Sequence, residues 1–289
     1  MTSPSLEDLQ TSIKLFADEQ EKKNNSKDEI IGKLESENAR LENEIIAKPE
    51  TVESFDDLPL HEDLLRGIYS YGLEKPSAVQ QRAIQPIVSG KDVIIQAEDG
   101  SGKATAVVIA ALQRIDYSSL GKPQVLIITT YREMALQIDK TTLALGDYLK
   151  VRCHVCIGGT LVRDDKDRLE NGQLHLVVGT PGRVGDMIRK GFLKMDNLKL
   201  FVLDSFDLLS SRAAFKEQVN GILSCLRRNL PVVISAPTMA PDMLDCILKF
   251  MRDPVLVKTD TLPLEGVRQF YIAIEKEEWK LGIDILTEF

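Results

Sequence analysis

The segment AEDGSGKA, residues 97–104, has the residue types with which proteins bind phosphate groups. It follows an apolar run, and its glycines, Gly100 and Gly102, allow backbone N–H groups to turn toward an anion. Lys103 supplies the positive charge that such loops place against the phosphates of a nucleotide. The position that usually carries a Mg²⁺-binding hydroxyl is Ala104. The pattern predicts a phosphate-binding loop that lacks one metal contact.

A second chemical signal is the segment FVLDSFDLL, residues 201–209, in which an apolar run ends on Asp204 and another acid, Asp207, follows. In nucleotide hydrolases an acid at this point meets Mg²⁺, and a neighbouring group positions or activates water. The neighbour here is Ser205, whose hydroxyl cannot act as a base near neutral pH. Two interpretations of Asp204 remain, a weak Mg²⁺ ligand or a structural acid that bonds the loop backbone.

Both segments belong to a pattern of short β-rich runs that alternate with helical stretches. The candidate strands are residues 92–97, 125–130, 152–157, 174–179, 200–204 and 232–236, with helical segments such as 103–115, 132–147 and 181–190 between them. Most of the strands are continuously apolar, as expected when both faces of a sheet are covered. We therefore predict a doubly wound parallel α/β domain whose ligand lies at the carboxyl ends of the strands.

Composition limits the classes of function. The chain has 289 residues and a formal net charge of −8, which disfavours general binding to nucleic acid and leaves a local basic groove as the route to it. No apolar run approaches the about 18–20 residues of a membrane span, and the N-terminus lacks the features of a signal peptide. We expect no membrane association and a cytoplasmic protein, with the nucleus as the alternative.

The cysteines at 153 and 156 have the C-x-x-C spacing, but no second pair stands at zinc-binding distance. They fall in a candidate strand, where residues three apart face opposite sides. Packed, reduced thiols are the preferred interpretation, and a metal or redox site is the alternative.

Residues 1–50 differ from the rest of the chain because they are rich in Glu, Lys, Asn and Ser. Apolar residues at alternating spacings of three and four, with Asn38 among them, predict a helix over about 27–46. This helix is either solvated or pairs weakly with a coiled-coil partner. We divide the chain into an extension at 1–50, a domain at 51–260 and a final segment at 261–289.

Further segments occur in a fixed order: GLEKPSAVQQRAI (72–84), YREMA (131–135), GG (158–159), TPGR (180–183), DSFD (204–207) and SAPT (235–238). Together with the phosphate loop, they resemble the first RecA-like domain of the DEAD-box RNA helicases, in the translation-initiation-factor-4A group. They stand where that family has its adenine-reading Q motif, motif Ia, glycine doublet, motif Ib, Asp-Glu-Ala-Asp motif and Ser-Ala-Thr motif. Residues 261–289 resemble the linker and the start of a second RecA-like domain, most of which would lie beyond Phe289.

The resemblance implies three sets of site residues. The nucleotide-binding set is Phe55, Gln80, Gly100, Ser101, Gly102, Lys103 and Ala104. The RNA-binding set is Arg132, Gly158, Gly159, Thr180, Pro181, Gly182 and Arg183. The catalytic positions, none of them with an intact motif, are Asp204, Ser205, Asp207, Ser235 and Thr238. Phe55 would stack on adenine and Gln80 would read it, unless both residues only brace the fold.

Several residues depart from the family pattern. Asp99 replaces a hydroxyl residue in the phosphate loop, Ala104 and Ser205 replace the Mg²⁺ ligand and the water-activating acid, and Pro237 interrupts the Ser-Ala-Thr motif. A carboxylate about 6 Å from one phosphate charge costs roughly 3 kcal/mol at an effective dielectric near 20. ATP or ADP would therefore bind weakly, and Mg²⁺ binding is doubtful.

The sequence predicts a degenerate, catalytically inactive family member that binds RNA, translation-initiation scaffold proteins, or both. The alternative is an ATP-dependent RNA helicase represented by its N-terminal domain.

Overall fold

The computed structural model describes residues 52–259 except 120, 212, 240–242 and 244–248. The helix predicted over 27–46 lies outside the described residues, as does the final segment, 261–289.

Within the described residues, seven short strands form one sheet, in the order β3-β4-β2-β5-β6-β1-β7. Every pair of neighbouring strands is parallel. The strands are β1 Val93–Gln96, β2 Val125–Ile128, β3 Cys153–Cys156, β4 Leu176–Gly179, β5 Leu200–Leu203, β6 Val232–Ala236 and β7 Val255–Lys258.

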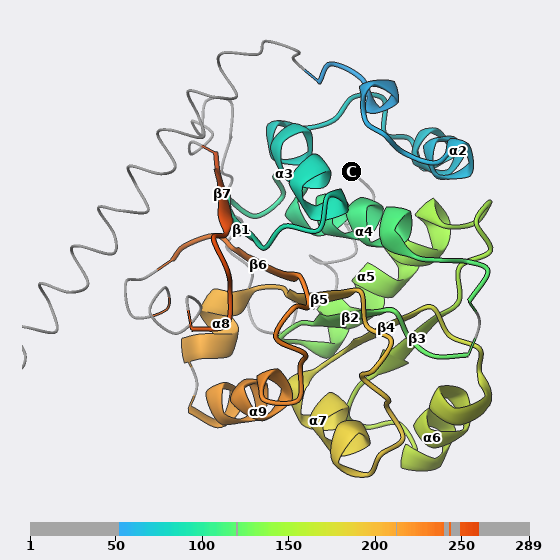
Figure 1. Cartoon of the computed structure of the whole chain (residues 1–289), viewed down its shortest axis with the longest axis vertical. Coiled ribbons are helices and arrows are strands. Elements are labelled where there is room, and N and C mark those ends of the chain that lie inside the picture. The colour runs from blue at the N-terminus through green and yellow to red at the C-terminus, as the bar shows by residue number, and fades with distance from the viewer. Residues whose placement is uncertain (1–51, 120, 212, 240–242, 244–248, 260–289) are drawn as a thin grey trace, which may run out of the picture.

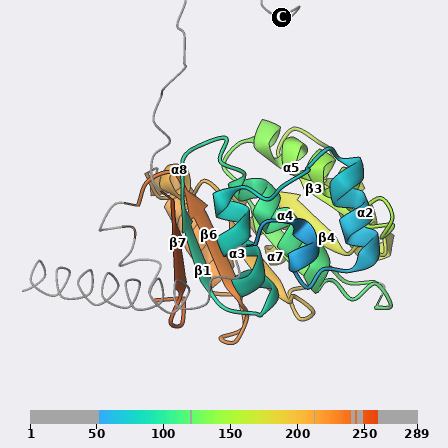
Figure 2. The same cartoon turned by 90° about the horizontal axis from the view of Figure 1, so that it is seen from above.

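Helices cover both faces of this sheet (Figure 1). They are α2 Glu62–Ser70, α3 Ala78–Val88, α4 Lys103–Arg114, α5 Arg132–Leu145, α6 Val162–Asn171, α7 Pro181–Arg189, α8 Phe206–Ser211 and α9 Ala213–Leu223, with a short 3-10 helix, η1, at Phe55–Asp57. Helices α2 to α5 lie on one face, which Figure 2 shows from above, and α6 to α9 lie on the other. The chain therefore builds a three-layer α/β/α sandwich.

The apolar strands have this arrangement because alternate residues point to opposite faces. Along β5, Leu200 and Val202 join the core under α2 to α5, whereas Phe201 and Leu203 join the core under α6 to α9. Side chains on both faces of the strand are thus covered by helices, which explains why the runs are continuously apolar. The predicted doubly wound parallel α/β fold is confirmed.

All six predicted strands are present, with ends shifted by up to two residues. The prediction missed β7, an edge strand in which buried residues alternate with more exposed ones. It also did not specify helices α2, α3, α6, α8 and α9.

Parallel strands place the segments that follow them along one edge of the sheet. The phosphate loop follows β1, Asp204 follows β5, and Pro237 follows β6. The glycine doublet follows β3 and the TPGR segment follows β4. The fold therefore gathers the predicted site residues at the carboxyl ends of the strands.

Candidate functional site

The phosphate loop has the backbone shape that its glycines permit. Gly100 and Gly102 have φ angles of +80° and +96°, a region that favours glycine. Gly102 also lies against α3, because a Cβ at this residue would come within 2.8 Å of the Gln80 amide nitrogen. The Ser77 hydroxyl donates to the Ser101 carbonyl at 2.8 Å, and the Ser77 backbone N–H donates to the Gln80 side chain at 2.9 Å. Ser77 therefore holds the loop against the start of α3, and Gln80 bonds to Ser77 and lies against Gly102.

The side chain of Lys103 folds back onto its own loop, and its ammonium bonds to that loop instead of being free for a ligand. Its side chain is 9% exposed. The ammonium donates to the carbonyl oxygens of Ala97 and Glu98 at 2.5 and 2.7 Å, and to a carboxylate oxygen of Asp99 at 3.2 Å. An ammonium has three N–H donors, so these contacts use all of them. An incoming phosphate would compete with the loop itself, and the Asp99 carboxylate already stands in for an anion.

The phosphate part of a nucleotide fits the loop only in part. The positive-φ glycines and the start of α4 offer N–H groups to an anion. The Ser101 hydroxyl oxygen is buried without a hydrogen-bond partner among the described residues, as expected of a group that awaits a ligand. Ala104 presents only a methyl group, so no side-chain oxygen stands at the first turn position where a metal contact is expected.

Asp204 lies directly beyond β5 and is 6% exposed. Its carboxylate accepts a hydrogen bond from the Ser235 hydroxyl at 2.5 Å, and longer ones from Thr129 and Ser205 at 3.4 Å. Burial raises the pKa of Asp204, although the Ser235 hydrogen bond and the nearby Lys103 charge oppose that shift. The Asp204 carboxylate therefore links the ends of β2, β5 and β6. One carboxylate supplies few of the oxygen ligands that Mg²⁺ needs, so Asp204 alone would bind this ion poorly.

The two residues after Asp204 are shaped by packing. Ser205 has a φ of +55°, which is uncommon for a residue with a side chain, and its carbonyl accepts the first bonds of α8 from Leu208 and Leu209. Phe206 is buried in the core under α6 to α9. One carboxylate oxygen of Asp207 is buried without a partner among the described residues. At the end of β6, Thr238 is exposed beyond Pro237.

Further along the same edge, Arg132 reaches the glycine doublet. Gly159 has a φ of +93°, and a Cβ on it would lie 2.8 Å from the Arg132 guanidinium. A Cβ on Gly158 would lie 3.2 Å from the same group. The absence of side chains on the doublet lets this exposed cation lie over the backbone. The structure thus brings three residues of the predicted RNA-binding set together.

The second cationic residue of the predicted RNA-binding set, Arg183, already has partners within the protein. Its guanidinium forms an ion pair with Asp165, and both side chains are nearly buried, with exposures of 10% and 2%. It also donates to the Thr160 hydroxyl at 2.9 Å and to the Thr160 carbonyl at 2.8 Å. A second hydrogen bond joins the other carboxylate oxygen of Asp165 to His154 Nε2, at 2.9 Å. Arg183 therefore joins the doublet loop to the start of α7.

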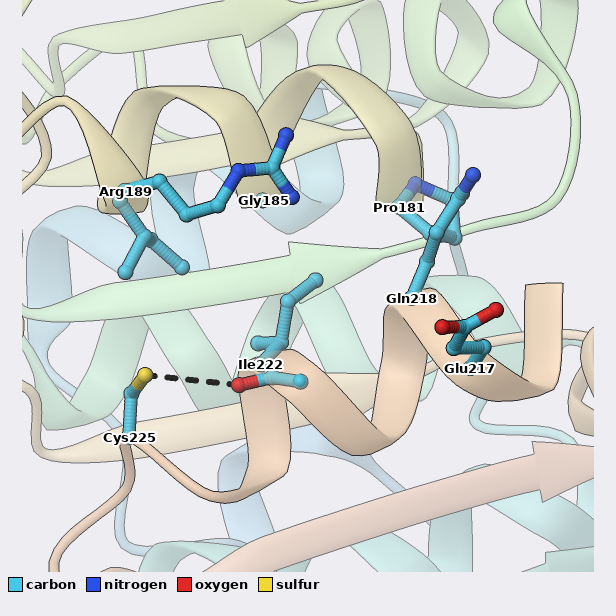
Figure 3. Close-up of a pocket in the computed structure, with 9 residues that line it drawn as sticks. Pro181, Gly185, Arg189, Glu217, Gln218, Ile222 and Cys225 are labelled. Carbon is cyan, nitrogen blue, oxygen red and sulfur yellow. Dashed lines mark hydrogen bonds between the residues drawn. The ribbon is translucent and has the colours of Figure 1, made fainter. Parts of the chain in front are cut away.

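Thr180, Pro181 and Gly182 form the N-terminal turn of α7, with proline at the first position. Gly182 is exposed, and the N–H groups of a first helical turn have no acceptor within the helix. A hollow of about 330 Å³ between α7 and α9 begins beside Pro181 (Figure 3). Gly185 and Gly221 line it from opposite helices, and no atom lies within 4 Å of a Cβ placed on Gly221.

Phe55 does not present a ring to the phosphate loop. It is fully buried in the core and meets Tyr69 edge-on, with ring centroids 6.5 Å apart. Stacking on a base needs an exposed ring face, so a stacking role for Phe55 would require its ring to move out of the core, and both interpretations stay predictions.

The C-x-x-C pair lies on β3. Cys156 is buried, and that burial raises the pKa of its thiol to about 12, so it is a poor thiolate ligand. His154, Cys156 and Asp165 do place one ligand atom each within 4.8 Å of one another. The Arg183 guanidinium occupies Asp165, so this group is an ion-pair network rather than a metal centre.

Sequence reasoning missed Asp165, Thr160 and His154, which fix Arg183. They lie in the strand, loop and helix before TPGR, and no motif marks them. It also missed Ser77, although a Ser followed by a Gln three residues later is the signature of a helix-capping box.

Comparison with known proteins identifies the fold's family. The sequence profile of the DEAD/DEAH box helicases matches residues 77–245. Eukaryotic initiation factor 4A of Cryptosporidium parvum is 54% identical over 234 residues, covering 80% of this chain and 57% of that protein. The ATP-dependent RNA helicase eIF4A of Schizosaccharomyces pombe is 53% identical over the same length, covering 80% of this chain and 59% of that protein.

Solved structures agree. A DEAD box protein from Methanococcus jannaschii superposes with a TM-score of 0.67 at 25% identity, over 82% of this chain and 64% of that one. Dbp5 of S. cerevisiae, solved with RNA and ADP BeF3, superposes with a TM-score of 0.65 at 25% identity, over 72% of this chain and 52% of that one. None of the helices in the described part of the chain has the length and apolar character needed to span a membrane.

The curated relatives are longer than the region that matches them, since this chain spans about 58% of their length. The range that the profile matches includes the phosphate loop, the buried acid after β5 and the segments along the same sheet edge. The chain belongs to the DEAD/DEAH box helicase family.

Proposed function

We propose that this chain is a degenerate member of the initiation-factor-4A group that acts by binding, without hydrolysing ATP. The observation that carries the proposal is the Lys103 ammonium, which is held by two loop carbonyls and the Asp99 carboxylate. Ala104 and Ser205 lack the groups that would bind Mg²⁺ and handle water in phosphoryl transfer. ATP or ADP would bind weakly if at all, through the residues from Gly100 to Ala104 braced by Gln80.

The RNA-binding role rests on the other part of the edge. Arg132 lies over the glycine doublet, and the first turn of α7 exposes Gly182. Helix N-termini and a neighbouring cation are groups that bind phosphates without reading bases. We propose that Arg132, Gly158, Gly159, Thr180, Pro181 and Gly182 contact the RNA backbone, while Arg183 positions them.

Protein partners follow from the family relationship. A relative that is 54% identical to this chain over 234 residues is named as an initiation factor. We therefore propose translation-initiation scaffold proteins as partners and the cytoplasm, or alternatively the nucleus, as the location. We also propose that residues 51–260 form the folded domain.

A second candidate function is that of an ATP-dependent RNA helicase represented here by its N-terminal domain. It is favoured by the 54% identity to initiation factor 4A and by the preserved backbone of the phosphate loop. Under this alternative, Lys103 would release its loop contacts when a nucleotide enters.

The test is phosphate release from ATP by the purified chain with Mg²⁺ and excess uridine oligonucleotide, with Lys103→Ala as the blank. We expect no release above that blank, and calorimetric titration should show no Mg²⁺-dependent tightening of ATP binding. Turnover in the unmodified chain that disappears in Lys103→Ala would establish the helicase alternative. Absence of binding to the oligonucleotide would refute the RNA-binding role separately.

A further inference from the structure

A second hollow, of about 480 Å³, lies at the end of the strands opposite to the phosphate loop. Its walls are the end of α9, the turn that leads into β6, and residues 249–252, which precede β7. Since β6 and β7 run parallel, both walls stand at the amino ends of their strands. The hollow is therefore separate from the edge that gathers the predicted nucleotide and RNA residues.

Its charge is unlike that of the whole chain. Four cationic side chains line it, those of Arg227, Arg228, Lys249 and Arg252, and no acidic residue belongs to its described lining. The formal net charge of the protein is −8. A one-signed cluster on a chain of opposite net charge focuses an attractive potential for anions.

The walls are held in place by a buried acid beneath them. Asp92 is 5% exposed, and its carboxylate accepts hydrogen bonds from the backbone N–H of Val232 at 2.8 Å and of Arg252 at 2.6 Å. The Arg252 side chain then reaches across to the Asn229 side chain at 3.1 Å. These contacts join the two walls, so the hollow is built into the fold and needs no rearrangement to form.

Two cations remain available for a ligand. The Arg227 guanidinium donates to the Leu198 carbonyl, and Arg252 is bonded to Asn229. Arg228 and Lys249 are exposed and form no ion pair with any described residue. They stand on opposite walls and can pair with separate carboxylates of one ligand.

The floor between the cations is apolar. Leu223, Leu230 and Met251 line it, and the Phe250 ring at the rim is 40% exposed. Single-stranded nucleic acid is usually held by several rings in succession along a basic track, and here one ring stands beside an aliphatic hollow. An apolar floor with a cationic rim instead fits a protein segment that inserts one large apolar side chain between acidic residues.

We propose that this basic hollow, residues 223–232 with 249–252, docks an acidic segment of a partner protein that carries an apolar anchor residue. The proposal names the chemistry of the scaffold partner and so rests on that part of the proposed function, but it does not depend on ATP or RNA binding.

The probe is a fluorescein-labelled synthetic peptide in which a central Trp-Leu pair is flanked by glutamates, followed by fluorescence anisotropy with the full chain. We expect saturable binding that weakens as salt rises. Arg228→Glu combined with Lys249→Glu should weaken it about tenfold or more, since two rim attractions become repulsions. The matched control, Lys75→Glu with Lys140→Glu, reverses two exposed cations elsewhere and should leave peptide binding unchanged.

Peptides with lysines in place of glutamates, or with serines in place of Trp-Leu, should bind weakly or not at all. Equal binding by the reversed and control variants, or no binding of the glutamate peptide to the unmodified chain, would overturn the proposal. A uridine oligonucleotide that loses affinity only in the Arg228→Glu, Lys249→Glu variant would assign the hollow to RNA and overturn it too. Thermal melting confirms folding, and Arg228→Gln with Lys249→Gln is the milder replacement if the reversed variant is unstable.

Discussion

The loop before α4 and the loops before α6 and α7 lie on the same edge of one sheet, but they depend on different chemical groups. Around Lys103 the expected function needs particular side chains, and those at 99, 104 and 205 differ from the family pattern. Around the glycine doublet it needs mainly exposed backbone and one cation, Arg132, and these are present. The comparison teaches that a site built from backbone groups and one cation depends on fewer particular side chains than a site for phosphoryl transfer does.

The two regions also differ in what their charged groups do. Lys103 pairs with Asp99, a carboxylate that is 89% exposed, so that ion pair is worth little to stability. Arg183 pairs with Asp165, which is 2% exposed, and removal of one member would leave a buried charge. The first pair lies within the phosphate loop, and the second pair joins α6 to the start of α7.

The largest expected effect is on stability, at the part of the edge for which we propose RNA binding. Arg183→Ala should lower the free energy of unfolding by about 3–5 kcal/mol, because Asp165 becomes an uncompensated buried charge. For a domain of this size that is a fall of about 10 °C in melting temperature, which calorimetry or circular dichroism measures. Arg189→Ala is the control, since this arginine lies on the same helix and is 73% exposed. A normal melting temperature with reduced RNA affinity would show instead that Arg183 is a direct ligand.

The next effect concerns the loop before α4. Asp99→Ser with Ala104→Thr should tighten ATP binding in Mg²⁺ by about tenfold or more, because one opposing charge is removed and one hydroxyl is added. Isothermal titration measures the change, and Lys103→Ala in the same background should abolish it. Hydrolysis should remain absent, since Ser205 still cannot handle water. Unchanged affinity in the double variant would locate the weakness outside the side chains of this loop.

A smaller effect tests Asp204 as a structural acid. Since burial raises its pKa above the ordinary value of 3.8, the folded state holds the proton more tightly than the unfolded chain does. The stability that this proton linkage contributes is present below that value and is lost as pH rises through the folded pKa. Asp204→Asn keeps an acceptor for Ser235, so unfolding titrations should become less dependent on pH in this range. At neutral pH stability should stay equal or rise by about 1 kcal/mol. A large loss of stability would show that the ionised carboxylate is needed.

Much of the fold could be predicted because its strands are buried on both faces. In β5 all four residues from Leu200 to Leu203 are buried, and such a run has few alternative structures. Strand β7 gave no such signal, because an edge strand is covered less completely. The phosphate loop could be predicted as well, since the φ angles of Gly100 and Gly102, +80° and +96°, favour glycine and so leave a mark in the sequence.

The interactions that decide what each site residue does could not be predicted in the same way. Arg183 meets Asp165 only because β4 places the start of α7 beside α6, and nothing in the spacing of the two residues indicates the contact. Likewise, Phe55 has the residue type of a stacking aromatic, but its burial against Tyr69 is a property of the packed core. The sequence indicates which chemistry is available, and the packing decides which groups are free to use it.

The smallest effect concerns Ser205, whose φ of +55° is a conformation that costs a residue with a side chain of order 1 kcal/mol. Its hydroxyl gains little in return, since its contacts with the Asp204 carboxylate and the Met134 sulfur are long, at 3.4 and 3.9 Å. Ser205→Gly should therefore raise the free energy of unfolding by about 0.5–1 kcal/mol, as measured by urea titration. Ser205→Ala keeps the strain and removes only the hydroxyl, so it should leave stability nearly unchanged. A glycine variant less stable than the alanine variant would mean that the turn is not strained, whereas a clear loss of stability in Ser205→Ala would mean that the hydroxyl has a structural role that its long contacts do not indicate.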